Sequence, residues 1–600
     1  MDTDQPAAAP DRPGATGRTA TDGSGPTSDR PGARAVRVVT GAARAVGRWF
    51  ARRDLSWPGM LGALVGLAAA MTPSLLPRPT LYLGLIAGVG AALGYGGGVL
   101  VAWVLRRTGV PLPPARVRRV AWRVLAWVGP VLAVVVVVVG AQWQDDVRVL
   151  VGEPRRTSSW FLVGVLALAA GLALIALGRA LRRVSRRVAR VLGRWVPAPA
   201  ASLLGVVVVA LLVYWLAAGV LFRVAVHVAD SVYAGTNAGT DPGVERVTSD
   251  LRSGSPASLV PWDTLGREGR SFVAGGPTPA QIGDVTGAAA LEPIRVYAGL
   301  DSADDADARA DLVVQELQRT GAFDRSVLVV AGATGTGWTE PQQMAALEYL
   351  WGGDTAIATI QYSFLPSWIS FLVDADRATQ AGRALFDAVH EAWSALPEDD
   401  RPKLISYGLS LGSFAGQAPF GSVGDLTNRV DGALFVGTPN ATPLWRTITA
   451  DRDAGSPEWR PVVDDGRVVR FAPDGTDLAE PGGTWGAPRV AYLQHASDPV
   501  VWWSWDLITR QPEWLEEPRG PDVSGRVRWF PLITFLQVTV DQFFGVSVPD
   551  GHGHNYASQV VAAWADVTQP PGWTDEDLTQ LQDLIDGTLT LPTVPGAGVG

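Results

Sequence analysis

The chain has 600 residues, a formal net charge of −8, five histidines and no cysteine. A hydrophobic content of 47% is too high for an ordinary soluble enzyme of this length, so part of the chain is expected to lie in a bilayer. The lack of cysteine excludes disulfides and thiolate metal sites. Arginines crowd the first third while acidic residues dominate the rest, which argues against a nucleic-acid-binding protein and favours a membrane anchor followed by an acidic domain.

The first 50 residues are a basic tail without apolar periodicity, which predicts disorder, and they contain no recognisable signal peptide. Between residues 51 and 228 lie five apolar segments, each long enough or nearly so to cross a hydrocarbon core of about 30 Å as a helix. They are residues 57–76, 80–104, 121–142, 159–178 and 201–222. The valine-rich run 134–139 favours a strand in water, but lipid leaves the backbone no outside partner and so favours a helix. A buried helical bundle in a soluble protein is the alternative interpretation.

Arginine clusters predict the orientation of these segments. They lie before the first segment, after the second and after the fourth, within residues 44–53, 106–119 and 179–194. The positive-inside rule places all three clusters on the cytoplasmic side. Five crossings that start inside carry the rest of the chain to the other side. We therefore expect a multi-pass protein of a bacterial plasma membrane with an extracytoplasmic second domain, and one helix more or fewer would reverse that side.

Residues 229–290, rich in Gly, Pro, Ser and Asp, are expected to form a linker or docking segment, and residues 571–600 a C-terminal helix and tail. Between 291 and 570, short apolar strands alternate with helical segments. The expected strands are 295–298, 326–330, 356–361, 403–407, 432–436 and 490–494, and the expected helices are 303–319, 341–351, 375–396 and 556–566. This alternation predicts an α/β fold with a mainly parallel sheet. The irregular interval 440–488 is the expected place of a lid.

The pentapeptide Gly-Leu-Ser-Leu-Gly at 408–412 directly follows a predicted strand and matches the Gly-x-Ser-x-Gly pattern of a nucleophile elbow. In such an elbow a strand turns sharply into a helix, and the glycines permit close packing around the serine. A single match in a glycine-rich chain is a weak signal. The rest of the chain decides whether the match is meaningful, because a catalytic Ser410 needs an acidic residue and then a histidine later in the sequence.

Two histidines, His552 and His554, come late enough in the chain to serve Ser410 as the base. They lie in the glycine-rich loop 549–556, just ahead of the last predicted helix of the domain. His554 is the favoured base because it is closer to that helix, and His552 is the alternative. A His-x-His pair also suggests a metal, but without thiolates or a third nearby histidine we expect neither metal nor cofactor.

Asp498 follows the strand 490–494 and is the favoured acid, since a carboxylate there could orient the imidazole and stabilise its charged form. A turn aspartate before proline is the plain alternative, and Asp541 and Asp550 are fallback acids. The backbone N–H groups expected to bind an oxyanion belong to the residue after the serine and to the loop after strand 326–330. They are those of Leu411, Thr334, Gly335, Thr336 and Gly337. A phosphate-binding loop is the rival interpretation, but no Gly-Lys-Ser/Thr follows.

Aromatic residues on two loops, Tyr362, Trp368, Trp502 and Trp503, are expected to form an apolar rim around the site, with ordinary core packing as the alternative. A rim of this kind fits an acyl chain or another apolar substrate better than a sugar or a peptide.

Together these motifs resemble the bacterial membrane-anchored α/β-hydrolases, which have an N-terminal multi-helix domain and a C-terminal catalytic domain. The resemblance spans about residues 55–570. It is carried by TGTGW at 334–338, QYSFLPSW at 361–368, GLSLG at 408–412, DPVVWW at 498–503 and GHGH at 551–554. It implies a serine hydrolase fold with Ser410, Asp498 and His554 as the triad, and it implies little about the substrate.

Two functions remain as alternatives. The first is a membrane-bound serine hydrolase of the esterase or lipase type, acting through an acyl-enzyme on a small apolar or lipid-like ester, with the bilayer as its partner and no nucleic acid. The second is a non-catalytic membrane scaffold or transport-associated protein with a ligand-binding hydrolase-like domain. The ordered serine, acid, histidine and glycine-rich loop favour the enzyme, and the scarcity of ionisable residues in the apolar segments argues against a transporter. The oligomeric state is left open.

Overall fold

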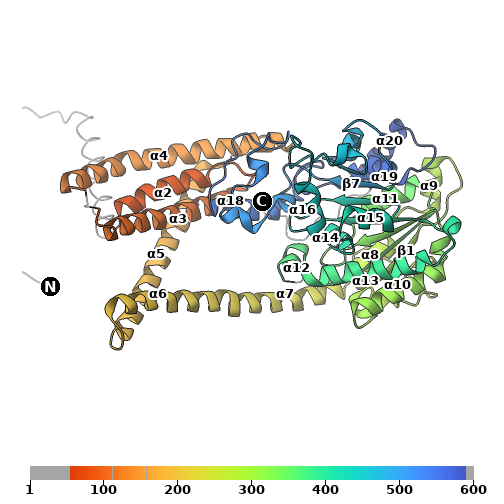
Figure 1. Ribbon diagram of the computed structural model, residues 1–600, viewed down its shortest axis with the longest axis horizontal. Coiled ribbons are helices and arrows are strands. Elements are labelled where there is room, and N and C mark those ends of the chain that lie inside the picture. The colour runs from red at the N-terminus through yellow and green to blue at the C-terminus, as the bar shows by residue number, and fades with distance from the viewer. Residues whose placement is uncertain (1–54, 111–112, 157, 374, 589–600) are drawn as a thin grey trace, which may run out of the picture.

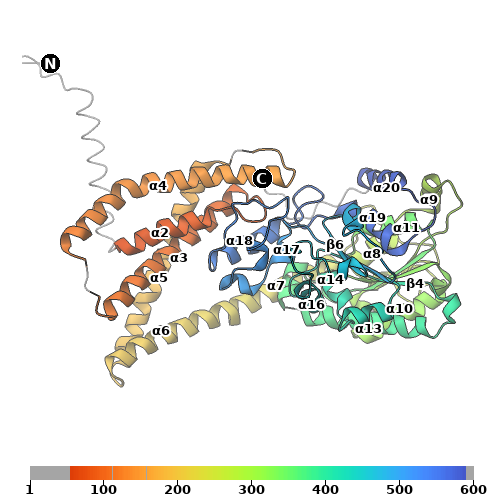
Figure 2. The same cartoon turned by 45° about the horizontal axis from the view of Figure 1, so that its top comes forward.

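The structure is a computed structural model that describes residues 55–110, 113–156, 158–373 and 375–588. The molecule is elongated, with a helical bundle at one end and an α/β domain at the other (Figure 1). A view turned by 45° shows helices α17 (Pro499–Trp502) and α18 (Ile533–Asp541) between the bundle and the sheet (Figure 2). The tail predicted to be disordered, residues 1–50, lies outside the described residues.

Apolar helices build the bundle. They are α2 (Trp57–Ala70), α3 (Thr80–Arg107), α4 (Ala115–Leu150), α5 (Trp160–Leu192) and α6 (Ala198–Tyr214), which continues through a π-helical segment into α7 (Phe222–Asn237). Within the described residues, four segments are long and apolar enough to cross a membrane, beginning at Thr80, Ala115, Trp160 and Ala198. The valine-rich run 134–139 is helical, as predicted.

The prediction for the first apolar segment, 57–76, is wrong for its last six residues, 71–76. Helix α2 ends at Ala70 and has 14 residues, so the five predicted spans become four long helices and one short helix. Three prolines at 73, 77 and 79 explain the early end, because proline and the residue before it both disfavour the helical conformation. The non-helical residues 71–79 turn toward the α/β domain, where Leu75 and Leu76 are fully buried.

Helices α2 and α3 approach so closely that glycine is required between them. A Cβ atom on Gly62 would lie 2.1 Å from the carbonyl oxygen of Gly94, and a Cβ on Gly94 would lie 2.0 Å from that of Gly62. Close approach through small residues is typical of helices that pack inside a membrane.

The α/β domain contains a seven-stranded parallel sheet in the order β1-β3-β2-β4-β5-β7-β6. The strands are β1 (Ile294–Ala298), β2 (Val327–Gly332), β3 (Thr355–Ile360), β4 (Lys403–Leu409), β5 (Gly432–Val436), β6 (Val469–Ala472) and β7 (Arg489–Leu493). The predicted α/β fold is confirmed. The sequence did not predict β6, which pairs with β7 at the sheet edge inside the interval where we expected a lid.

Helices cover both faces of this sheet (Figure 1). One face carries α10 (Ala306–Thr320), α13 (Ala375–Ser394) and α14 (Leu411–Gln417), and the other carries α11 (Pro341–Leu350), α19 (Val561–Thr568) and α20 (Asp575–Thr588). Alternate residues of a strand pack on opposite faces of the sheet. Leu328 of β2 lies in the core under α10, α13 and α14, and Val329 lies in the core under α11, α19 and α20. The segment 229–290, expected as a linker, contains two further helices, α8 (Gly266–Ala274) and α9 (Pro279–Thr286).

One buried ion pair joins the bundle to the α/β domain. Arg78 lies in the non-helical segment after α2, and its Nε is 3.5 Å from Oδ1 of Asp541 on α18 (Ile533–Asp541). The other carboxylate oxygen of Asp541 accepts the N–H groups of Leu75, at 3.1 Å, and Leu76, at 3.4 Å. Burial raises the pKa of Asp541 to about 6, and the charge of Arg78 opposes that rise. The carboxylate of Asp541 therefore binds the segment 71–79, which Gln537 and Gln144 hold through further hydrogen bonds to Thr72 and Arg78.

We predict that Asp541→Ala destabilises the protein by about 3–5 kcal/mol, because it leaves Arg78 buried without its partner. The control is Arg526→Ala, which breaks an exposed contact between the same two domains, 3.1 Å from Asp146, and should cost less than about 1 kcal/mol. Thermal unfolding of the detergent-solubilised protein measures both. Equal, small shifts in the two variants would show that the buried pair does not hold the domains together.

Candidate active site

Ser410 lies at a strained turn between β4 and α14, with φ 57° and ψ −127°. Its N–H donates to the carbonyl of Val436, 2.9 Å away at the end of β5. A Cβ on Gly408 would lie 2.3 Å from the carbonyl oxygen of Gly412, and one on Gly412 would lie 2.2 Å from that of Gly332. Both glycines of the pentapeptide are therefore required by packing around the serine.

Asp498 and His554 form a buried pair. Nδ1 of His554 is 2.7 Å from Oδ2 of Asp498, and the two side chains are 9% and 0% exposed. Asp498 caps the short helix α17 (Pro499–Trp502), where its Oδ1 accepts the N–H of Val500 at 2.8 Å. Because a carboxylate only accepts hydrogen bonds, Nδ1 carries the proton and Nε2 presents a lone pair. Nε2 is buried and has no hydrogen-bond partner within the described residues.

The imidazole of His554 lies beside the serine turn. Gly437 directly follows Val436, the acceptor for the N–H of Ser410, and a Cβ on Gly437 would lie 2.6 Å from Cε1 of His554. Ser410, Gly437 and Asp498 follow β4, β5 and β7, which are neighbours in the sheet. The structure thus brings the serine, the histidine and the acid to the carboxyl ends of adjacent strands.

His552 is placed differently. Its Nδ1 is 3.8 Å from Oδ2 of Asp522, too far for a hydrogen bond, and its side chain is 28% exposed. Asp522 instead accepts hydrogen bonds from the backbone N–H and the hydroxyl of Ser497, whose Oγ accepts the N–H of Gly553 at 2.8 Å. The geometry therefore favours His554 as the base, while Asp522 holds the loop that carries both histidines.

Tyr556, which the sequence did not single out, holds the acid. Its hydroxyl donates to Oδ2 of Asp498 at 2.7 Å and accepts the N–H of His495 at 3.1 Å. The ring of His495 stacks on Tyr556 with centroids 4.0 Å apart, and burial lowers the pKa of His495, so this histidine is a neutral packing partner. The fallback acids are engaged elsewhere, Asp541 with Arg78 and Asp550 with Asn555.

The glycine-rich loop after β2 begins against the serine turn, at the contact between Gly332 and Gly412. Within the loop, the N–H of Gly337 donates to the carbonyl of Thr334 at 2.9 Å, and the N–H of Thr334 donates to that of Trp338 at 3.0 Å. The N–H groups of Thr334 and Gly337, two of the loop candidates for the oxyanion, are therefore engaged within the loop itself. The candidates that remain are the N–H groups of Gly335, Thr336 and Leu411. Leu411 lies in the first turn of α14, where N–H groups lack an intrahelical acceptor.

The aromatic rim differs from the expectation. Trp502 is 1% exposed and packs against two other tryptophans, so it belongs to the core. Tyr362 and Trp503 are also buried, whereas Trp505 is 62% exposed. The side chain of Trp368 lies outside the described part of the chain.

The bundle reaches the loop that carries the histidines. A Cβ on Gly553 would lie 3.3 Å from Cδ2 of Leu76, and a Cβ on Gly152, after α4, would lie 3.4 Å from the ring of His552. The histidine loop is therefore packed between the two domains, with the carboxyl edge of the sheet turned toward the bundle.

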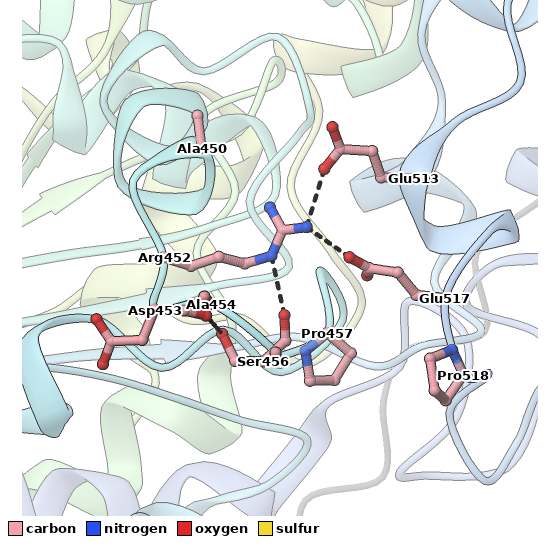
Figure 3. A pocket seen from close by; sticks show the side chains of 10 residues that line it. Ala450, Arg452, Asp453, Ala454, Ser456, Pro457, Glu513, Glu517 and Pro518 are labelled. Atoms are coloured by element: carbon pink, nitrogen blue, oxygen red, sulfur yellow. Dashed lines mark hydrogen bonds and ion pairs between the residues drawn. The ribbon is translucent and has the colours of Figure 1, made fainter.

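A separate cavity of about 440 Å³ lies between the segment after α16 (Pro443–Ala450) and residues 513–518 (Figure 3). Arg452 extends into it and donates to Glu513 at 2.9 Å and to Glu517 at 2.6 Å. None of the residues around Ser410 lines this cavity, and its arginine is paired with two glutamates, so it is separate from the candidate active site.

The glycine-rich loop ends in a buried carboxyl group, that of Glu340, which caps α11 through the N–H of Gln342. Burial raises the pKa of Glu340 to about 8; the hydrogen bond from Gln342 opposes the rise and the charge of Asp550 adds to it. This acid is therefore protonated in the folded protein at neutral pH.

Comparison with family models matched residues 294–581 to a model described as an alpha/beta-hydrolase family and residues 71–277 to one described as the N-terminus of that family. The two matches cover most of the chain and follow the order of the bundle and the α/β domain. No curated protein and no solved structure matched.

We predict that Glu340→Gln weakens the fall in stability between about pH 4.5 and about pH 8. The folded pKa of about 8 lies above the unfolded value of 4.5, so wild-type stability falls as pH rises through this window. Between pH 6 and pH 8 the variant should gain about 2 kcal/mol relative to wild type. Thermal unfolding across this range measures the gain, with the exposed Glu398→Gln as the control. Parallel curves for wild type and Glu340→Gln would contradict the prediction.

Proposed function

Because the chain belongs to this α/β-hydrolase family, we propose that it is a membrane-bound serine hydrolase that cleaves esters through an acyl-enzyme. The observation that carries the proposal is the Asp498–His554 pair, 2.7 Å apart, whose buried Nε2 lacks a partner beside the turn that holds Ser410. A buried Nε2 without a partner also occurs at His495, so the proposal depends on the position of His554, between the carboxylate of Asp498 and the serine turn.

In this mechanism, Oγ of Ser410 attacks the ester carbonyl while Nε2 of His554 takes the hydroxyl proton. Asp498 orients the imidazole and stabilises the imidazolium, and Tyr556 fixes the carboxylate. The N–H groups of Leu411, Gly335 and Thr336 stabilise the oxyanion. His554 then gives its proton to the leaving alkoxide, and water activated by the same nitrogen releases the acid and restores Ser410.

A lipid-like ester is the substrate class that the surroundings favour. The exposed apolar side chains of Trp505, Phe543 and Val546 lie on the segments around α18, which packs on α2 and α3. Apolar groups exposed at this junction suit a substrate drawn from the bilayer.

The arrangement of the helices supports an extracytoplasmic α/β domain. The turns between α3 and α4 and between α5 and α6 lie at the end of the bundle far from the α/β domain (Figure 1). These turns adjoin the arginine clusters at 106–119 and 179–194, which the positive-inside rule assigns to the cytoplasm. Counting the short helix α2 with the four long helices gives five crossings that start on the arginine side, so we propose a bacterial plasma-membrane protein whose site faces outward.

Labelling by a fluorophosphonate probe tests the hydrolase proposal. We expect the detergent-solubilised protein to react, and Ser410→Ala and His554→Ala to slow labelling by at least ~10³-fold because the nucleophile or its base is lost. His552→Ala is the matched control and should react close to the wild-type rate. If wild type stays unlabelled while another serine hydrolase reacts, the proposal fails and a ligand-binding scaffold takes its place.

Tyr556→Phe tests how the acid is held. The change removes a hydrogen bond to the carboxylate of Asp498, worth about 1.5–3 kcal/mol, and keeps the ring on His495, so kcat/KM for a p-nitrophenyl ester should fall at least ~10-fold. Tyr492→Phe loses a comparable buried hydrogen bond, 2.8 Å to Gln417, and should leave kcat/KM near wild type. An equal loss in both variants would mean that destabilisation alone explains the effect.

A further inference from the structure

An apolar groove of about 1510 Å³ runs along the bundle, between α2, α3 and the start of α4. Leu61 and Val65 of α2 and Leu93 and Val101 of α3 line it and are exposed. One end of the groove is closed by residues 530–533 of the α/β domain. It is separate from the serine site, and the inference drawn from it does not rest on the proposed hydrolase function.

The other end of the groove is strongly basic. It is lined by Arg106, Arg118, Arg119 and Arg123, all of them exposed. Arg106 donates to the carbonyl of Ala102 and Arg119 to that of Ala115, both within their own helices. No acidic side chain among the described residues pairs with any of the four arginines. The groove therefore joins a long apolar channel to a cluster of positive charge.

The length of the groove matches one layer of lipid. From Trp57 to Ala69 along α2 the distance is about 18 Å at 1.5 Å per residue. A hydrocarbon core is about 30 Å thick, so the groove accommodates the acyl chains of one leaflet. Guanidinium groups bind phosphate through paired hydrogen bonds, which suits an anionic headgroup at the basic end.

We propose that this groove binds an anionic phospholipid of the arginine-side leaflet. Its phosphate lies on the four arginines, and an acyl chain follows α2 and α3 toward Ile533. Because Ile533 begins α18, the helix that carries Asp541, the bound lipid contacts the element that joins the bundle to the α/β domain.

The N-terminal segment of the same chain is a poorer occupant. Between residues 34 and 53 it contains six arginines and no acidic residue. Its charge has the same sign as the basic end of the groove, so the two repel one another, whereas an anionic lipid is attracted.

Two neighbouring glycines provide a test of the apolar part. Gly97 lines the groove and Gly96 does not, and a Cβ on either would meet nothing within 4 Å. Gly97→Phe should fill the groove without a clash, while Gly96→Phe places the same ring on the neighbouring surface of α3. Spin-labelled phosphatidylglycerol and phosphatidylcholine, each in nanodiscs with the full-length protein, report the fraction of lipid that the protein immobilises.

We expect wild type and Gly96→Phe to immobilise phosphatidylglycerol in preference to phosphatidylcholine, and Gly97→Phe to lose the preference. Replacing the four groove arginines with glutamine should weaken phosphatidylglycerol retention at least ~10-fold. The matched control replaces the same number of exposed arginines on α5, Arg182, Arg183, Arg186 and Arg187, and should keep it.

Two results would overturn the proposal. Equal losses in the groove and α5 arginine variants, with Gly97→Phe like wild type, would mean that lipid is held by general surface charge. Because the chain has no cysteine, Val39→Cys combined with Gly97→Cys gives a clean crosslink test. Efficient disulfide formation in that variant would show that the N-terminal segment occupies the groove.

Discussion

The buried contact between Arg78 and Asp541 is the constraint on which the arrangement of the two domains depends. Both side chains are fully buried, and each charge faces the other, while Arg78 also donates to Thr72 and Ser74. The carboxylate also binds the backbone N–H groups of Leu75 and Leu76, so residues 71–79 cannot continue helix α2. Leu76 then reaches the loop of His554. A membrane anchor joined to the α/β domain only by a linker would not place Leu76 against this loop.

The chemistry of the site follows from the directions of its hydrogen bonds. Tyr556 and His554 both donate to one oxygen of Asp498, and the other oxygen caps α17. The carboxylate is thereby held in one orientation, which fixes the proton of His554 on Nδ1 and leaves Nε2 as the basic nitrogen. Ser410, held at a positive φ by the contacts of Gly408 and Gly412, stands at the neighbouring strand end. The proposed hydrolase function uses each of these contacts.

Helix α18 connects the bundle to the α/β domain through several contacts. Helix α18 contacts α2 and α3 and carries Asp541, and its Thr539 accepts the indole N–H of Trp503 at 2.8 Å. Residues 530–533, which lead into α18, close the apolar groove of the bundle. Helix α18 therefore contacts three features: the proposed lipid groove, the interdomain ion pair and Trp503, which follows the acid in the sequence. This connection gives the membrane domain a physical route to the proposed catalytic site.

The sequence by itself determined the α/β fold, six of the seven strands, the apolar helices and the order of serine, acid and late histidine, because these depend on periodicity and local turn chemistry. The roles of Ser410, Asp498 and His554 stay predictions. Tertiary structure decided which histidine meets the acid, which loop N–H groups are engaged, and that Trp502 is core. It also revealed β6, a short edge strand within a Pro- and Gly-rich interval, and the early end of α2. Partners such as Leu75 and Asp541 stand 466 residues apart, and no local pattern encodes a contact at that separation.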